Sequence, residues 1–260
     1  MELTYRQKQH IYEYGYVHIP GVVPHIRVDA ALRAINHSVG QGMDPAQMNK
    51  YRAQTFCPEI TRTPPITDLL LKTPAWELAE SVIGEGQIQP VTGGQVALRF
   101  PGLQDPPGPA RPHIDGLHSP NNGVPAGTLA SFTMLVGILL SDLPGPDAGN
   151  FTVWPGTHRL YERYFREHGT EELLRGMGGG MPNIPLPDPV QITGRPGDIV
   201  LCHYQLAHGV TPNVSPHPRY AAFFRLSHVE HAAHKIAALT DIWLAWPGMR
   251  PVLPEARQDS

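Results

Sequence analysis

The chain has 260 residues, of which 41% are hydrophobic and 17% are charged. This apolar share is enough to bury a core and excludes a disordered chain, although the charged share is below the roughly 25% of an ordinary globular domain. The 20 basic and 23 acidic residues leave a net charge of −3, which argues against nucleic acid or an anionic membrane surface as a partner. The length fits one large domain, and we expect a single domain over residues 1–260.

The first 85 residues contain helical patterns, and we expect them to form a helical annex packed on the rest of the fold. A β-branched and aromatic stretch, Tyr16–Ile19, predicts a strand directly after the first helix. Three segments have apolar residues at helical intervals and end at a glycine, namely Thr4–Tyr14, Arg27–Val39 and Ala75–Val82.

Residues 86–230 have a different character, with short β-prone runs separated by proline and glycine. Runs of this kind with turn residues between them are typical of a barrel or jelly roll. We therefore predict a mainly β fold with its core in residues 86–230 and a C-terminal segment at 231–260. The runs are Gln95–Phe100, Leu129–Leu140, Phe151–Trp154, Val190–Thr193, Asp198–Tyr204 and Tyr220–Val229.

One segment of this β-rich region has helical intervals. The pattern covers Leu160–Met177 and is followed by the three glycines Gly178–Gly180. A helical stretch beside a glycine-rich hinge is typical of a lid that closes over a site. We expect residues 160–185 to be a lid-like insertion.

Cysteine usage and hydropathy limit the class of protein further. Cys57 and Cys202 form no Cys-x-x-Cys motif, so neither a zinc ribbon nor a disulfide scaffold is predicted. The longest largely apolar run, Phe132–Leu140, is shorter than the ~20 residues of a membrane span, and the N-terminus has no signal-peptide pattern. These features favour a cytoplasmic protein that does not insert into membranes.

Common catalytic motifs are missing from the sequence. It contains no GxxxxGK[ST], no HExxH and no GxSxG, which argues against P-loop nucleotide hydrolases, zinc proteases and α/β-hydrolases. The glycine-rich run Gly176–Gly180 does not match GxGxxG and follows no predicted strand. A dinucleotide site is therefore not expected.

The strongest chemical signal is the motif His113-Ile114-Asp115. Residues i and i+2 of an extended segment point to the same face and can bind one metal ion together. His208, near the end of an apolar strand, supplies a third ligand. Two histidines and one carboxylate form the facial triad of non-haem Fe(II) sites, which leaves coordination positions open for small molecules.

An arginine follows the last of these ligands. Arg219 stands eleven residues after His208, beyond a segment whose proline, asparagine and serine content predicts a hairpin turn. On the neighbouring strand, Arg219 could lie across the sheet and bind a carboxylate, such as that of a dicarboxylic keto acid, with its planar guanidinium. Arg225 shares the strand face but lies roughly 20 Å further along, which favours Arg219.

The order of these motifs resembles the phytanoyl-CoA dioxygenase family, a branch of the Fe(II)/2-oxoglutarate oxygenases. The resemblance extends from about Glu2 to Val229. One departure is Pro112, which stands where an aromatic residue commonly precedes the metal histidine. The matching segments are Arg99–Gly102, His113–Gly116, Gly149–Arg159, Pro196–Val200 and His208–Gly209, followed by Asn213 and Arg219.

The resemblance implies a double-stranded β-helix of jelly-roll or cupin-like form with N-terminal helices packed on it. It implies that His113, Asp115 and His208 bind Fe(II), and that Arg219 binds the distal carboxylate of 2-oxoglutarate. Gln95 and Arg99 match positions of polar co-substrate contacts, although lysine is usual where Arg99 stands.

The implied reaction uses O₂ and converts 2-oxoglutarate to succinate and CO₂ while a small, moderately hydrophobic metabolite is hydroxylated or otherwise oxidised. Related enzymes that install halogen have a small residue in place of the metal carboxylate, so Asp115 predicts oxidation and not halogenation. Candidate substrate contacts are His118, Asn121, Thr133 and Trp154.

Two other functional classes fit the same ligand pattern. A cupin-type isomerase or dioxygenase would use the three metal ligands without a keto acid and would have no need of Arg219. A non-enzymatic metal- or ligand-binding barrel would release no succinate under any condition. Turnover of 2-oxoglutarate distinguishes the three classes, whereas the sequence carries no signal for the oligomeric state.

Overall fold

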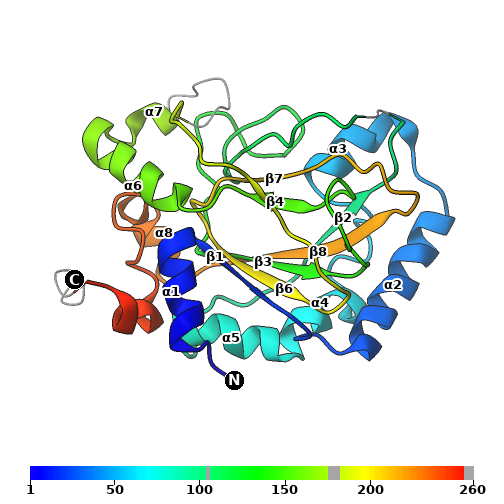
Figure 1. The fold of residues 1–260 in the computed structure, drawn as a ribbon, viewed down its shortest axis with the longest axis horizontal. Coiled ribbons are helices and arrows are strands. Elements are labelled where there is room, and N and C mark those ends of the chain that lie inside the picture. The colour runs from blue at the N-terminus through cyan, green and yellow to red at the C-terminus, as the bar shows by residue number, and fades with distance from the viewer. Residues whose placement is uncertain (104–105, 175–181, 255–260) are drawn as a thin grey trace.

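The computed structural model describes residues 1–103, 106–174 and 182–254 and contains two antiparallel β-sheets (Figure 1). The larger sheet has the strand order β1-β6-β3-β8-β2, and the smaller one has the order β5-β4-β7. The strands of the larger sheet are β1 (Tyr16–Ile19), β6 (Ile199–His203), β3 (Met134–Leu139), β8 (Arg219–Leu226) and β2 (Gln95–Arg99). Those of the smaller sheet are β5 (Val190–Gln191), β4 (Phe151–Val153) and β7 (His208–Val210).

The two faces of the larger sheet have different partners because side chains alternate along each strand. Val96 and Leu98 of β2 belong to the buried cluster that includes the N-terminal helices. On the other face, Phe223 of β8 packs against Phe151 of β4, with ring centroids 5.2 Å apart. The smaller sheet therefore covers the face of the larger sheet that the helices leave open.

The helices of the N-terminal region begin and end where the sequence supplies caps. Thr4 and Gln7 form a capping box at the start of α1, and Gly15 ends this helix with φ 83°. A Cβ atom at Gly15 would lie 2.6 Å from His158 Nδ1, so the position has no room for a larger residue. The helices are α1 (Tyr5–Tyr14), α2 (His25–Gly40), α3 (Met48–Ala53), α4 (Pro64–Leu71) and α5 (Pro74–Ile83), with a 3-10 turn, η1, at Pro45–Gln47.

Strand β8 organises the face that carries polar side chains. Its register pairs Arg219 with Arg99 of β2 and Arg225 with Leu135 of β3. Because alternate residues share a face, Arg219, Phe223 and Arg225 all point toward the smaller sheet. The space between the two sheets therefore receives arginine side chains from both ends of β8.

The segment that was predicted to be a lid-like insertion, residues 160–185, differs from that prediction. The predicted helix Leu160–Met177 is interrupted at Gly169, which has φ 79° and ends α6. The predicted hinge Gly178–Gly180 lies outside the described residues. The remaining helices are α6 (Thr157–His168), α7 (Glu171–Leu174) and α8 (His231–His234), with 3-10 turns η2 (Ala237–Leu239) and η3 (Pro247–Val252).

Two fold predictions need correction. The described chain has more residues in helices than in strands, so the fold is mixed and not mainly β, because α3 and α4 were not expected and the strands are shorter than predicted. The segment between His208 and Arg219 is also no hairpin, since β7 and β8 belong to different sheets. Among the described residues, no helix has the length and apolar character needed to cross a membrane.

Candidate active site

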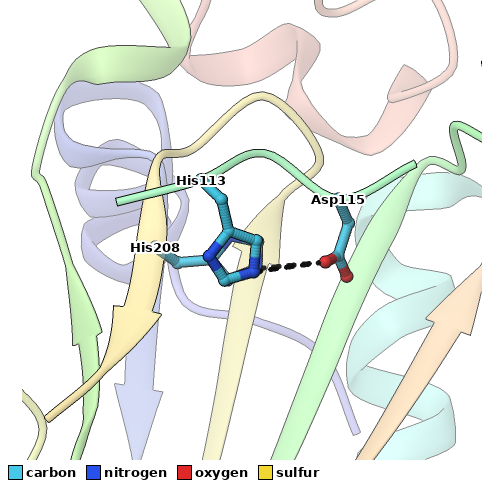
Figure 2. Close-up of side chains that lie close together, drawn as sticks. All are labelled: His113, Asp115 and His208. Carbon is cyan, nitrogen blue, oxygen red and sulfur yellow. Dashed lines mark ion pairs between the residues drawn. The ribbon is translucent and has the colours of Figure 1, made fainter. Parts of the chain in front are cut away.

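His113 and His208 are brought together by a pair of backbone hydrogen bonds. The His113 N–H donates to the His208 carbonyl at 2.8 Å, and the His208 N–H donates to the His113 carbonyl at 3.0 Å. Residues paired in this way across antiparallel backbone place their side chains on one face. The two imidazole rings accordingly lie with centroids 4.5 Å apart (Figure 2).

Asp115 completes the cluster from the same extended segment. Its Oδ1 atom lies 3.5 Å from His113 Nε2 and 3.7 Å from His208 Nε2. One ligand atom from each of the three residues lies within 4.8 Å of the others, and Figure 2 shows the side chains converging. Gly116 follows with φ 81°, and a Cβ there would lie 2.4 Å from the Ala130 carbonyl oxygen, so the turn after Asp115 requires glycine.

The hydrogen bonding of His208 prepares it to bind a metal. Its Nδ1 lies 2.9 Å from the Leu206 carbonyl oxygen, and a carbonyl can only accept, so Nδ1 carries the proton. Nε2, which lies 3.7 Å from Asp115 Oδ1, therefore keeps its lone pair for a metal ion. Two imidazoles and one carboxylate on one face, with a fixed tautomer on the buried histidine, are a donor set suited to non-haem iron.

The carboxylate of Asp115 is fixed by Arg225. Arg225 donates to Asp115 Oδ2 from Nη2 at 2.7 Å and from Nε at 2.9 Å, and it also donates from Nη1 to Gln95 Oε1 at 3.0 Å. Burial opposes ionisation of Asp115, but the charge of Arg225 and the nearby imidazoles of His113 and His208 outweigh it and hold the pKa of that carboxyl well below its usual range.

These side chains line a cavity of about 350 Å³ between the two sheets. Its walls come from β2, β7 and β8, from residues 113–119 before β3, and from the region of α3. Both apolar and charged side chains line it, so the cavity can hold a ligand with both kinds of group. The apolar members include Phe56, Ile114, Leu117, Leu135, Phe151 and Phe223.

Arg219 lies buried in this cavity with 2% of its surface exposed. Its Nε donates to the Gly149 carbonyl at 2.7 Å and its Nη1 to the Ala97 carbonyl at 3.0 Å. Burial, and then the charge of Arg99, lower the pKa of Arg219 to about 9. No carboxylate of the described residues forms an ion pair with it, so the remaining guanidinium N–H groups are available to an anionic ligand.

Three other predicted polar contacts also line the cavity, namely Gln95, Arg99 and His118. Gln95 and Arg99 lie at opposite ends of β2, so they face different parts of the cavity. Gln95 contacts Arg225, whereas Arg99 lies opposite Arg219 in the β2–β8 register. His118 Nδ1 lies 2.6 Å from the Val124 carbonyl oxygen, which fixes the loop that borders the cavity.

The other three predicted substrate contacts lie outside the cavity wall. Thr133 is buried, and its Oγ1 accepts a hydrogen bond from the His228 N–H at 2.9 Å. Trp154 is buried behind β7, against Gly209. Asn121 is exposed, while its neighbour Asn122 lines the cavity. In each case the sequence indicated the region but not the direction of the side chain.

Sequence reasoning missed two arginines of the cavity. Alternation along β8 places Arg225 on the correct face, but only the fold brings its guanidinium to Asp115. Arg52 lies on α3 and gave no signal, because an arginine on a helix surface is usually a solvated residue. None of the described residues of the 160–185 segment lines the cavity.

Comparisons with solved structures agree with this architecture. HygX from Streptomyces hygroscopicus, a structure with nickel and 2-oxoglutarate bound, is similar with a TM-score of 0.57 and 19% identity, covering 88% of this chain and 88% of that one. The structure of EctD from S. alaskensis with 2-oxoglutarate and 5-hydroxyectoine is similar with a TM-score of 0.54 and 18% identity, covering 88% of this chain and 77% of that one. The α-ketoglutarate-dependent carbocyclase SnoK of nogalamycin biosynthesis is similar with a TM-score of 0.54 and 20% identity, covering 86% of this chain and 83% of that one.

No curated protein matches the chain significantly in sequence. Residues 11–221 match the family described as phytanoyl-CoA dioxygenase (PhyH), and this range includes the triad and Arg219. The chain therefore belongs to the phytanoyl-CoA dioxygenase family of non-haem iron, 2-oxoglutarate-dependent oxygenases.

Proposed function

We propose that this protein binds Fe(II) through His113, Asp115 and His208 and uses 2-oxoglutarate and O₂ to oxidise a small-molecule substrate. The observation that carries the proposal is one cavity with a metal-ligand cluster in its wall and the buried, uncompensated Arg219 within it. The proposed scaffold is a double-stranded β-helix, formed by the two facing sheets within a single domain over residues 1–260.

The residues of the chain divide the binding task. The imidazoles and Asp115 provide three protein ligands, and Arg219 receives the distal carboxylate of 2-oxoglutarate through the N–H groups that the backbone carbonyls leave free. When bound, iron with the keto acid and O₂ supplies the oxidising power, with succinate and CO₂ as co-products. Phe151 and Phe223, which pack against each other beside His208, exclude water from this part of the cavity.

The need for an anion at Arg219 favours this reaction over a cupin-type isomerase or dioxygenase that uses no keto acid. A buried guanidinium with no carboxylate partner is costly unless a ligand supplies one. A dicarboxylate that also reaches the metal cluster satisfies both features of the cavity. A non-enzymatic barrel would need the metal cluster or the arginine, but not both in one cavity.

Hydroxylation is the simplest outcome, and other oxidations are open to the same scaffold. Proteins of similar structure include an α-ketoglutarate-dependent carbocyclase and an epimerase, so the position of the substrate decides the product. Halogenation is not proposed, since Asp115 fills the position that chloride would need. Mass spectrometry of the product formed in chloride-rich buffer tests this point, and a chlorinated product from the unmutated protein would contradict it.

The central experiment measures 2-oxoglutarate binding by anaerobic calorimetry, with and without Fe(II). We expect 2-oxoglutarate to bind the iron-loaded protein and to bind much more weakly without iron. Iron binding with no effect on 2-oxoglutarate would favour the cupin-type alternative. Absence of iron binding under these conditions would refute the metal site itself.

A further inference from the structure

The cavity contains more positive charge than its proposed metal and co-substrate use. Four arginines line it, Arg52, Arg99, Arg219 and Arg225, against the single carboxylate of Asp115. Asp115 is ion-paired with Arg225, so the other three arginines have no carboxylate partner among the described residues. The charges of a divalent metal ion and of the dianion 2-oxoglutarate cancel each other. The three positive charges of these arginines therefore remain in excess.

Arg99 shows most directly that this surplus is uncompensated. It is directly opposite Arg219 in the β2–β8 register, and like charges in opposing positions of a sheet are destabilising. Burial lowers the pKa of Arg99, and the charge of Arg52 lowers it further. One distal carboxylate cannot neutralise this group of three, whichever arginine binds it.

Two contacts that follow Arg52 in the chain position it at the cavity. After α3, Gln54 Nε2 donates to the Asn121 carbonyl at 2.8 Å, which connects the helix end to the loop at the cavity border. Two residues later, the Phe56 N–H donates to the Val96 carbonyl at 2.9 Å, which connects the chain to β2. The exposed guanidinium of Arg52 is therefore located at the cavity by the fold.

We infer that the substrate carries an oxyanion, a carboxylate or a phosphoryl group, that binds between Arg52 and Arg99, with an apolar portion extending toward the metal cluster. This inference rests on the proposed function and names the substrate class of that site. Arginine is suited to both oxyanions because its planar fork donates two parallel hydrogen bonds. Phe56, Ile114 and Leu117 provide apolar surface in the same cavity.

The test uses three probes with the same six-carbon chain and different head groups: hexanoate, hexyl phosphate and hexanamide. Each is titrated calorimetrically into anaerobic protein already saturated with Fe(II) and 2-oxoglutarate. We expect one of the two anions to bind about tenfold or more tightly than the neutral amide, since hydrogen bonds to charged groups are the strong ones. The tighter anion identifies the head group as carboxylate or phosphoryl.

Matched variants assign the preference to the cavity. Arg52→Gln should remove the preference for the anion while 2-oxoglutarate still binds, and Arg52→Lys should restore part of it. Arg33→Gln, which removes an exposed arginine of α2 outside the cavity wall, should leave the preference unchanged.

Several results would overturn the inference. One is equal affinity for all three probes. Another is a preference for the anion that persists in Arg52→Gln, which would mean that the anion binds the metal instead. The third is displacement of 2-oxoglutarate by the anion. Failure of 2-oxoglutarate to bind before any probe is added would instead refute the proposed function, and this earlier step separates the two failures.

Discussion

The two charged regions of the cavity differ in how their charges are balanced. Around the metal cluster, Asp115 receives hydrogen bonds from Arg225, and Gln95 occupies a further arginine donor. In the second region, the charge next to Arg219 is Arg99, and the charge next to Arg99 is Arg52, so all three have the same sign. The first region is organised by the protein alone, whereas the second requires ligands to become electrostatically favourable.

This difference separates preorganisation from recognition. A metal site benefits from ligands that already have their orientation and charge state before the metal arrives. A site that binds anions benefits from unpaired donors whose desolvation has already occurred on folding. Substitutions in the two regions should therefore affect metal binding and anion binding separately.

The largest effect should come from removing a metal ligand. His208→Ala leaves a two-ligand site, and we expect Fe(II) affinity to fall by more than the roughly 100-fold that loss of an outer-shell partner costs. Anaerobic calorimetry with Fe(II) measures this, with His37→Ala on the exposed surface of α2 as the control. Unchanged affinity in His208→Ala would remove His208 from the metal site.

The next effect concerns the uncompensated region. Arg219→Gln should retain Fe(II) binding and weaken 2-oxoglutarate binding by about 2–5 kcal/mol, because a desolvated carboxylate loses its charged partner. Arg219 also donates to the Gly149 and Ala97 carbonyls, so Arg219→Lys provides a second variant that keeps the charge. Circular dichroism checks folding, and full 2-oxoglutarate affinity in both folded variants would assign the distal carboxylate to Arg99.

A smaller effect should follow from loosening the compensated region. Arg225→Gln removes the group that orients Asp115, and we expect Fe(II) affinity to fall about tenfold, at the lower end of outer-shell effects. Arg225→Lys keeps the charge but loses the two-point contact, so its Fe(II) affinity should lie between that of Arg225→Gln and that of the wild type. Arg33→Gln controls for the loss of one positive charge. An Arg225→Gln protein with wild-type iron affinity would show that Asp115 needs no such support.

The smallest expected effect is a change in the free energy of unfolding, whose sign should differ between the two regions. In the metal-free protein, Arg52→Gln relieves repulsion within a like-charged group and should stabilise the fold by a few tenths of a kcal/mol, since the side chain is exposed. Arg225→Gln should destabilise it, because Asp115 loses its ion-pair partner. Urea unfolding of both variants measures the difference. Destabilisation of the same size in both would indicate that the two regions are electrostatically alike.

The sequence by itself determined the parts of the site that depend on short-range geometry. His113 and Asp115 share a face because they are two residues apart in extended backbone, and the chemical types of His208 and Arg219 indicated a metal and a carboxylate. The helix ends at Gly15, Gly40 and Gly84 were also predicted within a few residues. The order of these features carried the resemblance to the phytanoyl-CoA dioxygenase family, and the family match over residues 11–221 confirms it.

Only the tertiary structure decided which residues meet across the cavity. Alternation specifies the face of a strand but not its neighbour, so β7 and β8 were predicted as one hairpin although they belong to two sheets. For the same reason the contact between Arg225 and Asp115 and the approach of Arg52 to Arg99 were missed, and Thr133 and Trp154 were placed in the wrong environment. The contact between Arg225 and Asp115 joins residues 110 apart in the sequence, a separation at which pairing is set by packing of whole elements and not by local preference.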